Sequence, residues 1–288
     1  MARSKKERKM RDPWNWSKEL RLLPGYLIVI IWIGFTATFL CWILGASLST
    51  SKEIFSGKVF AFESGIHWEN YASAWQAQNV AKFFGNSLLY AVTACIGTLL
   101  ISAPGAYVLS RFEFFANKSL KSSLIIAMSV PGVMIIMPIF ALTTRLGIKG
   151  RILLILFYTL MHVPSTTTYL LNFFATLSKT YEEAAAIDGC PPGKTFWVIM
   201  LPLVQPAIIT VTIFNFLGVW NEFFIFASSA DMTPVGVGLL QIVNAMKYTG
   251  DYGGLFAAVV IVFLPTFLLY IFLSEKIIAG VTGGGIKG

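Results

Sequence analysis

The chain has 288 residues, of which 56% are hydrophobic and only 12% charged, with a mean hydropathy of +0.71 and a formal net charge of +8. Because soluble domains carry about a quarter charged residues, this composition excludes an ordinary soluble globular protein. It indicates a protein that lies largely within a membrane.

A basic segment begins the chain. Residues 1–21 contain eight Lys or Arg residues and stop directly before a long apolar window. A nucleic-acid-binding arm is one interpretation, but the position beside a spanning window, with Trp14 and Trp16 suited to the interface, favours a membrane topology signal. The window is too long for a signal peptide, whose apolar core covers about 7–15 residues, so we expect the first helix to be retained.

Six windows free of Asp, Glu, Lys and Arg follow along the chain. They cover residues 22–51, 83–110, 122–144, 152–178, 195–221 and 252–274. About 20 apolar residues cross a bilayer as a helix, and backbone groups in lipid must be satisfied within the segment. The windows also lack the two-residue alternation of a β-barrel. The sequence therefore predicts an all-α polytopic fold with six transmembrane helices in residues 22–278, between the basic segment 1–21 and a tail at 279–288.

The distribution of basic residues predicts the orientation of these helices. With six spans, 15 of the 22 Lys and Arg residues fall on the side of the two termini. The positive-inside rule therefore places both termini in the cytoplasm. The basic connection at residues 145–151 disagrees locally, and an even number of spans places it outside.

The connection after the fourth window raises the question of nucleotide binding, because residues 193–195 read Gly-Lys-Thr, as at the end of a phosphate-binding loop. That loop has a glycine where this chain has Asp188. It also needs a preceding strand and converging backbone amides, and Pro191 and Pro192 remove two of these amides. We therefore reject the phosphate-loop interpretation.

A short helix is expected in front of these prolines. Thr180 and Glu183 form a capping-box pattern, which predicts a helix from Tyr181, and Gly189 with the prolines ends it. Such a short helix with little apolar surface has marginal stability alone, so the residues leave two roles open: docking in a partner's groove or a polar connector on the membrane surface. One face of its helical wheel carries Tyr181, Ala184, Ala185 and Asp188.

The same segment resembles a family signature. Glu183-Ala184-Ala185, then Gly189, and after nine residues Ile199 with Leu201-Pro202, match the spacing of the EAA motif of bacterial ATP-binding-cassette (ABC) importer permeases. The longer phrase EEAAAIDGCPPGKTFWVIMLPLVQPA looks like the carbohydrate-uptake, maltose-transporter-like branch, and so do residues 86–87 (NS) and 220–223 (WNEF). The resemblance covers nearly the whole chain, although only the EAA loop is diagnostic.

The resemblance implies a type I ABC importer permease fold and a non-catalytic subunit that couples to a cytoplasmic ATPase. The coupling loop would cover residues 179–204, and Gly189 in a positive-φ conformation would set the angle between two short helices. Leu201-Pro202 would fix the start of the fifth span. The residues that the resemblance assigns to ATPase coupling are Glu182, Glu183, Ala184, Ala185, Asp188, Gly189, Ile199, Leu201 and Pro202.

The family also implies partners. These are a homologous second permease chain, two ABC ATPase subunits and an extracytoplasmic solute-binding protein, assembled in the bacterial inner membrane. No cofactor would bind this chain, because ATP and Mg would be bound by the ATPase. Rigid motion of the docked loop would move the fourth and fifth spans and so exchange inward for outward access. Residues 229–251, an outer stretch too short to span, would be re-entrant or reach towards the binding protein.

Candidate residues for the path of a sugar are polar or aromatic and lie in or beside the windows: Asn172, Asn215, Trp220, Asn221 and Glu222. For each we favour a structural role, with Asn215 bonding between helices and Trp220 in the interfacial aromatic belt. We likewise expect His162 to be a packed residue rather than a proton relay, and we expect no metal site and no disulfide from the three scattered cysteines. An ion-coupled secondary transporter is the alternative function.

Overall fold

The computed structural model describes residues 16–77, 80–147, 150–222 and 232–283, and every regular element among them is helical. The basic residues 1–15 and the tail 284–288 lie outside the described residues. The elements are α1 (Trp16–Ser47), α2 (Ser51–Phe55), α3 (Glu69–Ala77), α4 (Val80–Arg111), α5 (Asn117–Ser129), α6 (Gly132–Arg145), α7 (Arg151–Thr176), α8 (Thr180–Ile187), α9 (Pro192–Thr195), the π-helix η1 (Phe196–Met200), α10 (Leu201–Leu203), α11 (Gln205–Trp220), α12 (Val235–Thr249) and α13 (Tyr252–Gly283).

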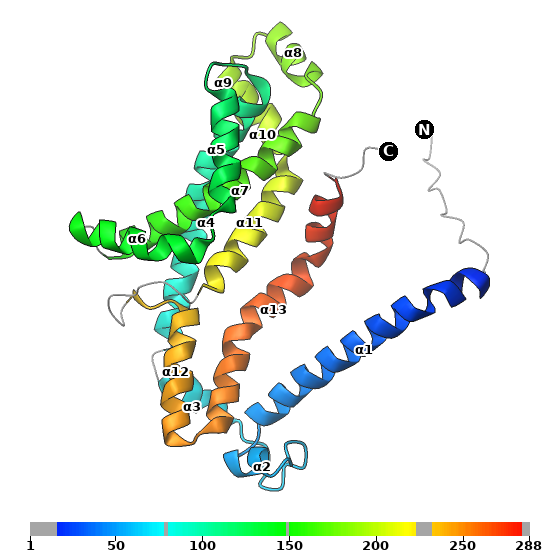
Figure 1. Cartoon of the computed structure of the whole chain (residues 1–288), viewed down its shortest axis with the longest axis vertical. Helices are drawn as coiled ribbons and strands as arrows, with labels where there is room; N and C mark the ends of the chain where they lie inside the picture. Colours follow the sequence, from blue (N-terminus) through cyan, green and yellow to red (C-terminus); the bar gives the residue numbers. More distant parts are fainter. Residues whose placement is uncertain (1–15, 78–79, 148–149, 223–231, 284–288) are drawn as a thin grey trace.

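The body of the molecule is an elongated bundle of α4, α7, α11 and α13 (Figure 1). Small and hydroxyl side chains allow α4 and α7 to approach closely. The Thr98 hydroxyl donates to the Thr159 carbonyl at 3.0 Å, and a Cβ added at Gly97 would lie 3.0 Å from the Thr159 side chain. Close packing of small residues with interhelical hydrogen bonds is the usual means of association between helices in lipid.

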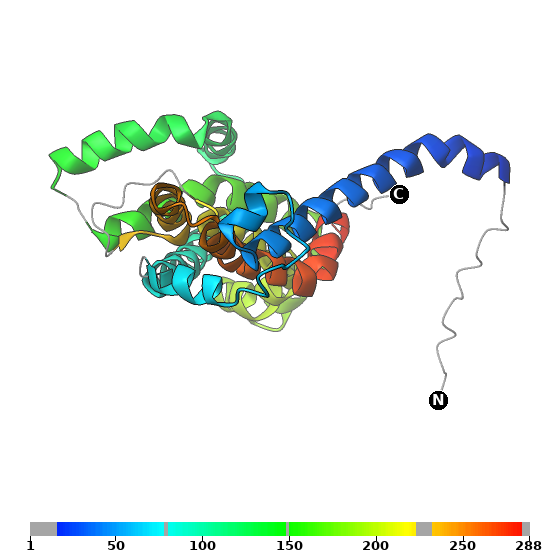
Figure 2. The same ribbon diagram turned by 90° about the horizontal axis from the view of Figure 1, so that it is seen from below.

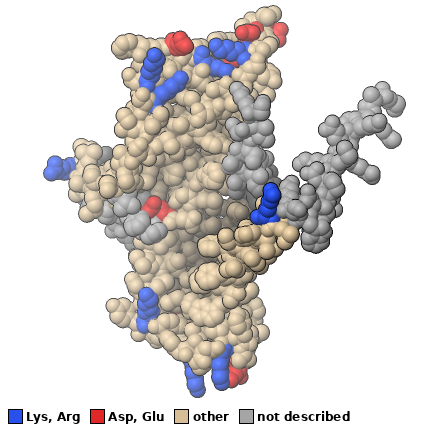
Figure 3. Space-filling view, turned by 45° about the vertical axis from the view of Figure 1, so that its right-hand side comes forward, with Lys and Arg blue, Asp and Glu red and all other residues tan. Residues whose placement is uncertain are grey.

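Charged side chains lie mainly at the two ends of this bundle. On the face in Figure 3, Lys, Arg, Asp and Glu gather at the ends of the long axis, and only isolated charges appear at mid-height. Large apolar side chains such as Ile125, Ile152 and Phe263 are exposed between the ends. An apolar belt between charged ends is the surface expected of a protein that crosses a bilayer.

Four helices are long and apolar enough to cross a membrane: Leu20–Ser47, Val80–Arg111, Arg151–Thr176 and Tyr252–Phe272. The other two predicted spans are bent, so the structure contains six only if each bent pair is counted as one. Residues 117–145 bend by 106° between α5 and α6, and residues 192–220 bend by 74° between α10 and α11. The structure thus contains four to six candidate spanning helices, and the number of exactly six spans stays a prediction.

Proline chemistry accounts for both bends. Val130 is extended, with φ −83° and ψ 120°, because the following Pro131 disfavours helical conformation in the residue before it. In the second pair, Val204 leaves the helical region and Pro206 lies in the first turn of α11. Proline is tolerated in the first turn of a helix, so Pro206 fits the start of a new helix, α11, within a window that hydropathy alone treats as one segment.

Two elements stand away from the body. The spanning part of α1 is 0% buried and meets α13 only towards its end at Ser47, and α6 projects from the opposite side (Figures 1 and 2).

The buried residues form three clusters along the bundle. A coupling-end core joins the ends of α4 and α7 to η1, α10 and α11. A middle core lies between α4, α7 and α11, and a far-end core joins α3, α4, α11, α12 and α13. The coupling-end core contains Ala103, Ala106, Tyr107, Leu170, Phe174, Phe196, Met200, Val204, Ala207 and Val211.

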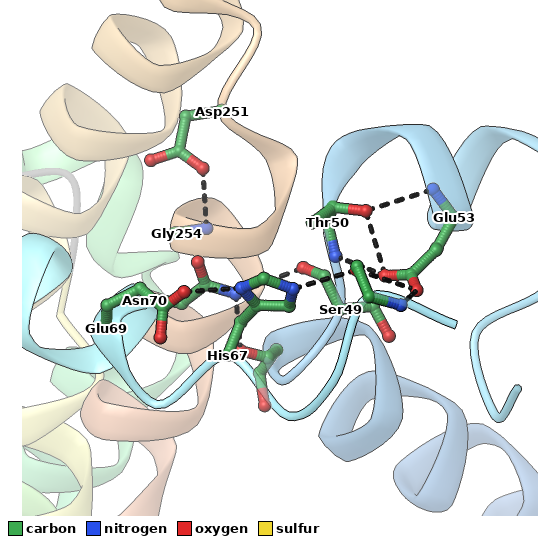
Figure 4. Close-up of polar contacts among 10 residues, drawn as sticks. Ser49, Thr50, Glu53, His67, Glu69, Asn70, Asp251 and Gly254 are labelled. Carbon is green, nitrogen blue, oxygen red and sulfur yellow. Dashed lines mark hydrogen bonds and ion pairs between the residues drawn. The ribbon is translucent and has the colours of Figure 1, made fainter. Parts of the chain in front are cut away.

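At the far end, polar contacts order the chain between α1 and α3 (Figure 4). Glu53 closes a capping box with Thr50 at the start of α2 and accepts hydrogen bonds from the Ser64 N–H at 3.0 Å and the Ser64 hydroxyl at 2.9 Å. Nδ2 of Asn70 donates to the carbonyls of Ser47 and Ser49, both at 3.0 Å. These buried or half-buried contacts hold a segment that would otherwise be a long loop.

The outer stretch 229–251 contains a complete helix, α12, although residues 223–231 lie outside the described residues. Two polar residues of α4 hold its start: Nδ2 of Asn86 donates to the Thr233 carbonyl at 3.0 Å, and the Val235 N–H donates to the Ser87 hydroxyl at 2.7 Å. Its buried side packs on α4 and α13. This stretch is thus part of the far-end core.

Candidate functional site

The predicted short helix is α8, which lies at one tip of the bundle (Figure 1). It begins at Thr180, one residue earlier than expected, and the capping box predicted for Thr180 is absent. The Thr180 N–H instead donates to the hydroxyl of Ser178 at 3.2 Å, while the Lys179 carbonyl accepts from the N–H groups of Glu182 and Glu183 at 3.1 Å. The Ser178 hydroxyl and the Lys179 carbonyl thus accept the first N–H groups of α8, and the Thr180 side chain caps none of them.

The C-terminus of α8 is terminated at Gly189, as predicted, and Gly189 has φ +72°. The Gly189 N–H donates to the Ala186 carbonyl at 3.0 Å, and the Cys190 N–H donates to the Ala185 carbonyl at 2.8 Å. These two bonds are the Schellman arrangement, in which the residue after the cap adopts the left-handed conformation. Pro191 and Pro192 then start α9 at once, so the two short helices have a fixed turn between them.

The faces of α8 differ from the predicted wheel. Ala185 is only 3% exposed and faces the body of the chain, whereas Tyr181, Ala184 and Asp188 are exposed. Ile187, which the motif does not include, is 86% exposed. The small-residue face is therefore divided: Ala185 seats the helix, and the exposed side presents two large side chains, Tyr181 and Ile187, beside small and acidic ones.

An ion pair seats the other inward position of α8. Oε1 of Glu182 lies 2.7 Å from Nε of Arg111, the last residue of α4, and the two side chains are 20% and 8% exposed. Nη2 of Arg111 also donates to the Leu177 carbonyl at the end of α7, at 3.0 Å. Of the three acidic residues assigned to ATPase coupling, Glu182 thus contacts this chain, whereas Glu183 and Asp188 are exposed.

Aromatic packing lies under α8 and α9. The Tyr107 ring is 5.1 Å from that of Phe196 and 5.5 Å from that of Phe174, measured between centroids. Tyr107 and Arg111 are one helical turn apart on α4, so one side of that helix end supports the whole loop. Sequence reasoning missed Tyr107, Arg111 and Ile187, because no local pattern indicates which residues of α4 meet a helix far along the chain.

The remaining motif positions lie along the next segment. Ile199 and Leu201 are partly buried against the coupling-end core, and Pro202 is exposed in α10. Leu201-Pro202 lies in α10, directly before the bend at Val204, and α11 begins after that bend at Gln205. What precedes Gly193 is helix α8 and a turn, with no strand among the described residues, as the rejection of a phosphate loop requires.

The candidate substrate residues are not brought together. Asn172 is exposed on α7, whereas Asn215 is buried on α11, where its Nδ2 donates to the Thr166 hydroxyl at 2.9 Å. Trp220 is 3% exposed in the far-end core and so is not part of an interfacial belt. Asn221 is exposed and Glu222 half-buried at the end of α11. The bond between Asn215 and Thr166 fits the structural role expected for Asn215.

His162 packs between α7 and α11. Nδ1 of His162 lies 2.8 Å from the Tyr158 carbonyl one turn earlier in α7, and its ring packs over Gly218. In the described part of the chain, no three His, Cys, Asp or Glu side chains gather as a metal site would require. Cys41, Cys95 and Cys190 are free thiols.

Comparison with known proteins agrees with this geometry. Residues 97–275 match the family described as binding-protein-dependent transport system inner membrane component. The chain is 34% identical over 269 residues to the diacetylchitobiose uptake system permease protein NgcG of Streptomyces coelicolor, covering 91% of this chain and 88% of that protein. It is 32% identical over 254 residues to the sulfoquinovosyl glycerol transport system permease protein SmoH of Agrobacterium fabrum, covering 86% and 87%.

The fold also has a counterpart among solved structures. A chain in the crystal structure of a bacterial ABC transporter involved in the import of the acidic polysaccharide alginate superposes with a TM-score of 0.80, over 92% of this chain and 99% of that one, at 19% identity. These matches confirm the resemblance seen in the EAA loop and leave the ion-coupled alternative without support. The chain belongs to the family of binding-protein-dependent transport system inner membrane components, and it is the membrane-integral permease subunit of an ABC importer rather than its ATP-hydrolysing subunit.

Proposed function

We propose that the chain forms half of the translocation path for an oligosaccharide or a related glycoside, within a type I importer of six spans per permease. The observation that carries this proposal is α8, an exposed helix at the tip of the bundle that is seated on the chain by Ala185 and Glu182 and presents Tyr181, Ala184 and Ile187 outwards. Ile187 is 86% exposed and Tyr181 46% exposed, so the free side of α8 offers apolar contact area to a protein partner.

The proposed occupant of that face is a cytoplasmic ATPase subunit, which binds the ATP and Mg. Both termini and α8 then lie in the cytoplasm, and a homologous second permease, a second ATPase and an extracytoplasmic solute-binding protein complete the complex. The proposed substrate class rests on the similar permeases, whose names refer to diacetylchitobiose and sulfoquinovosyl glycerol. The chemistry shared by these two is a glycosidic sugar unit.

Closure of the ATPase dimer would carry α8 with it and move the helices to which α8 is attached. Such coupling requires a stiff joint. The Schellman turn at Gly189, the two following prolines and the buried seat of Ala185 provide one, because they leave little freedom between α8 and α9.

Site-directed crosslinking tests the docking. In a background without Cys41, Cys95 and Cys190, we expect a cysteine at Ala184 or Ile187 to crosslink to the ATPase in the assembled complex. A cysteine at the buried Ala185 serves as the matched control and should react much less. Equal labelling at Ala184 and Ala185, or no crosslink from the exposed positions, would contradict the docking geometry.

Uptake tests the transport function. The complex, reconstituted in proteoliposomes with its binding protein, should accumulate a labelled oligosaccharide only when ATP is present on the α8 side. Charge reversal of Glu183 to Lys on the exposed face should reduce this uptake while membrane insertion continues. Uptake driven by an ion gradient without the ATPase would refute the proposal.

A further inference from the structure

The end of α4 is held to α8 by one side chain that no motif of the sequence includes. Arg111 is the last residue of α4, and its side chain reaches both the end of α7 and α8. Its guanidinium group contacts Glu182 of α8 through Nε, at 2.7 Å, and the carbonyl of Leu177 through Nη2, at 3.0 Å. One buried cation thus joins the ends of three helices.

These contacts suit the groups that they join. The Leu177 carbonyl belongs to the C-terminal cap of α7, where carbonyls lack helical partners and a cation is favourable. Nε–H of Arg111 is not aligned with Oε1 of Glu182, so their contact is a close ion pair rather than a directed hydrogen bond. Since both side chains are largely buried, removing one of them would leave an uncompensated charge.

The chain connections alone do not hold α8 rigidly against α4 and α7. Between α7 and α8 lie only residues 177–179, which have no regular structure, and α4 is joined to α8 along the chain only through α5, α6 and α7. A displacement of α8 could therefore bend this connection without moving α4. The contacts of Arg111, together with the packing of Tyr107 one turn earlier in α4, restrict this movement of α8 relative to α4.

We propose that Arg111 is a positioning residue for transport, which makes α8 and the ends of α4 and α7 move as one unit. This inference deepens the proposed function and rests on it, because it assumes that α8 is the element on which the ATPase acts. Arg111 touches neither ATP nor the transported solute. Its role is to pass the movement of α8 directly to α4, the helix that packs along α7.

The test measures coupling in the assembled complex. In proteoliposomes containing both permeases, the ATPase subunits and the binding protein, the readout is the amount of labelled oligosaccharide taken up per ATP hydrolysed. Arg111→Met should lower this ratio at least about fivefold, the lower end of measured coupling between sites. Lys118→Met, which removes an exposed cation at the start of α5, outside the coupling loop, is the matched control and should leave the ratio unchanged.

Two further variants separate positioning from folding. Arg111→Met with Glu182→Leu removes both charges, so no unpaired charge remains buried and the complex should assemble. We expect this pair to be uncoupled, while Arg111→Glu with Glu182→Arg, which restores attraction, recovers much of the ratio. A wild-type ratio in the assembled Arg111→Met and Glu182→Leu variant would overturn the proposal.

The crosslink from Ala184→Cys to the ATPase distinguishes the two levels of inference. If that crosslink forms in the Arg111 variants while the uptake ratio falls, docking is intact and the coupling has been lost, as we propose. If the crosslink is absent even with Arg111 and Glu182 in place, the proposed docking of α8 is wrong and the proposal for Arg111 falls with it.

Discussion

The conformation of Gly189 allows a quantitative test of the joint between α8 and α9. With φ +72°, Gly189 lies in the left-handed region, which costs other residues about 1–2 kcal/mol. A Cβ added at this position would have no neighbouring atom within 4 Å, so the backbone conformation supplies the whole penalty for Gly189→Ala. At 1.4 kcal/mol for each factor of ten, the turn should be populated about 5- to 30-fold less relative to competing conformations.

A graded series follows from this value. Gly189→Asn should have a small effect, because asparagine tolerates the left-handed region. Gly189→Ala should be intermediate. Gly189→Pro should be the most damaging, because proline fixes φ near about −65° and has no N–H to donate to the Ala186 carbonyl.

The assay is co-purification of the ATPase with the permease, followed by ATP-driven uptake of a labelled oligosaccharide. The matched control is Gly193→Ala in α9, where a Cβ also meets nothing within 4 Å and φ is not positive. We expect the control to bind and transport normally. Full uptake by Gly189→Pro, or equal losses in Gly189→Ala and Gly193→Ala, would refute the role assigned to this turn.

Three further predictions concern the rest of the molecule. Gly238→Ala should destabilise the far-end core by about 1–3 kcal/mol, because the new methyl group would collide with the buried Phe83 ring, and a lower melting temperature in detergent would show it. Asn215→Ala should also lower the melting temperature, because it removes the hydrogen bond to Thr166, worth about 0.6–2 kcal/mol in membranes. The apparent KM for the transported solute should not change. A large rise in KM would instead place Asn215 in the substrate path. Hydrogen bonds from the backbone N–H groups of Ser64 and Thr50 lower the pKa of Glu53 to about 2 from its ordinary 4.5, so its stabilising contribution is present above pH 4.5 and is lost as the pH falls towards 2. The protection of residues 50–64 against hydrogen exchange, relative to their intrinsic exchange rates, should therefore fall across that window, and Glu53→Gln should abolish this dependence on pH.

Much of the architecture could be predicted from local patterns. Apolar windows indicated a helical membrane protein because lipid permits only helices and closed barrels, and the windows lack the alternation of barrel strands; the family matches agree. The end of α8 at Gly189 could be predicted because a glycine before two prolines is a local stop signal. The rejection of a phosphate loop had the same local basis, since prolines lack the amides that bind an anion.

Hydropathy could not show the bends within two of the windows. It measures how apolar a stretch is and not the direction of the helix axis, so it could not predict the bends within residues 117–145 and 192–220. Pro131 and Pro206 carried the signal, but proline is also tolerated inside helices of this protein, as at Pro104 and Pro164. Whether a proline bends or interrupts a helix depends on the packing around it.

The sequence by itself determined the class of protein, the loop that marks its family and the turn that ends α8, because each depends on residues close together in the chain. Only the tertiary structure decided which side of α8 is free. Ala185 and Glu182 are among the residues that the resemblance assigns to ATPase coupling, yet they face the chain, because Arg111 and the coupling-end core occupy the space beneath them. That assignment depends on contacts between distant segments, and no local pattern of residues encodes it.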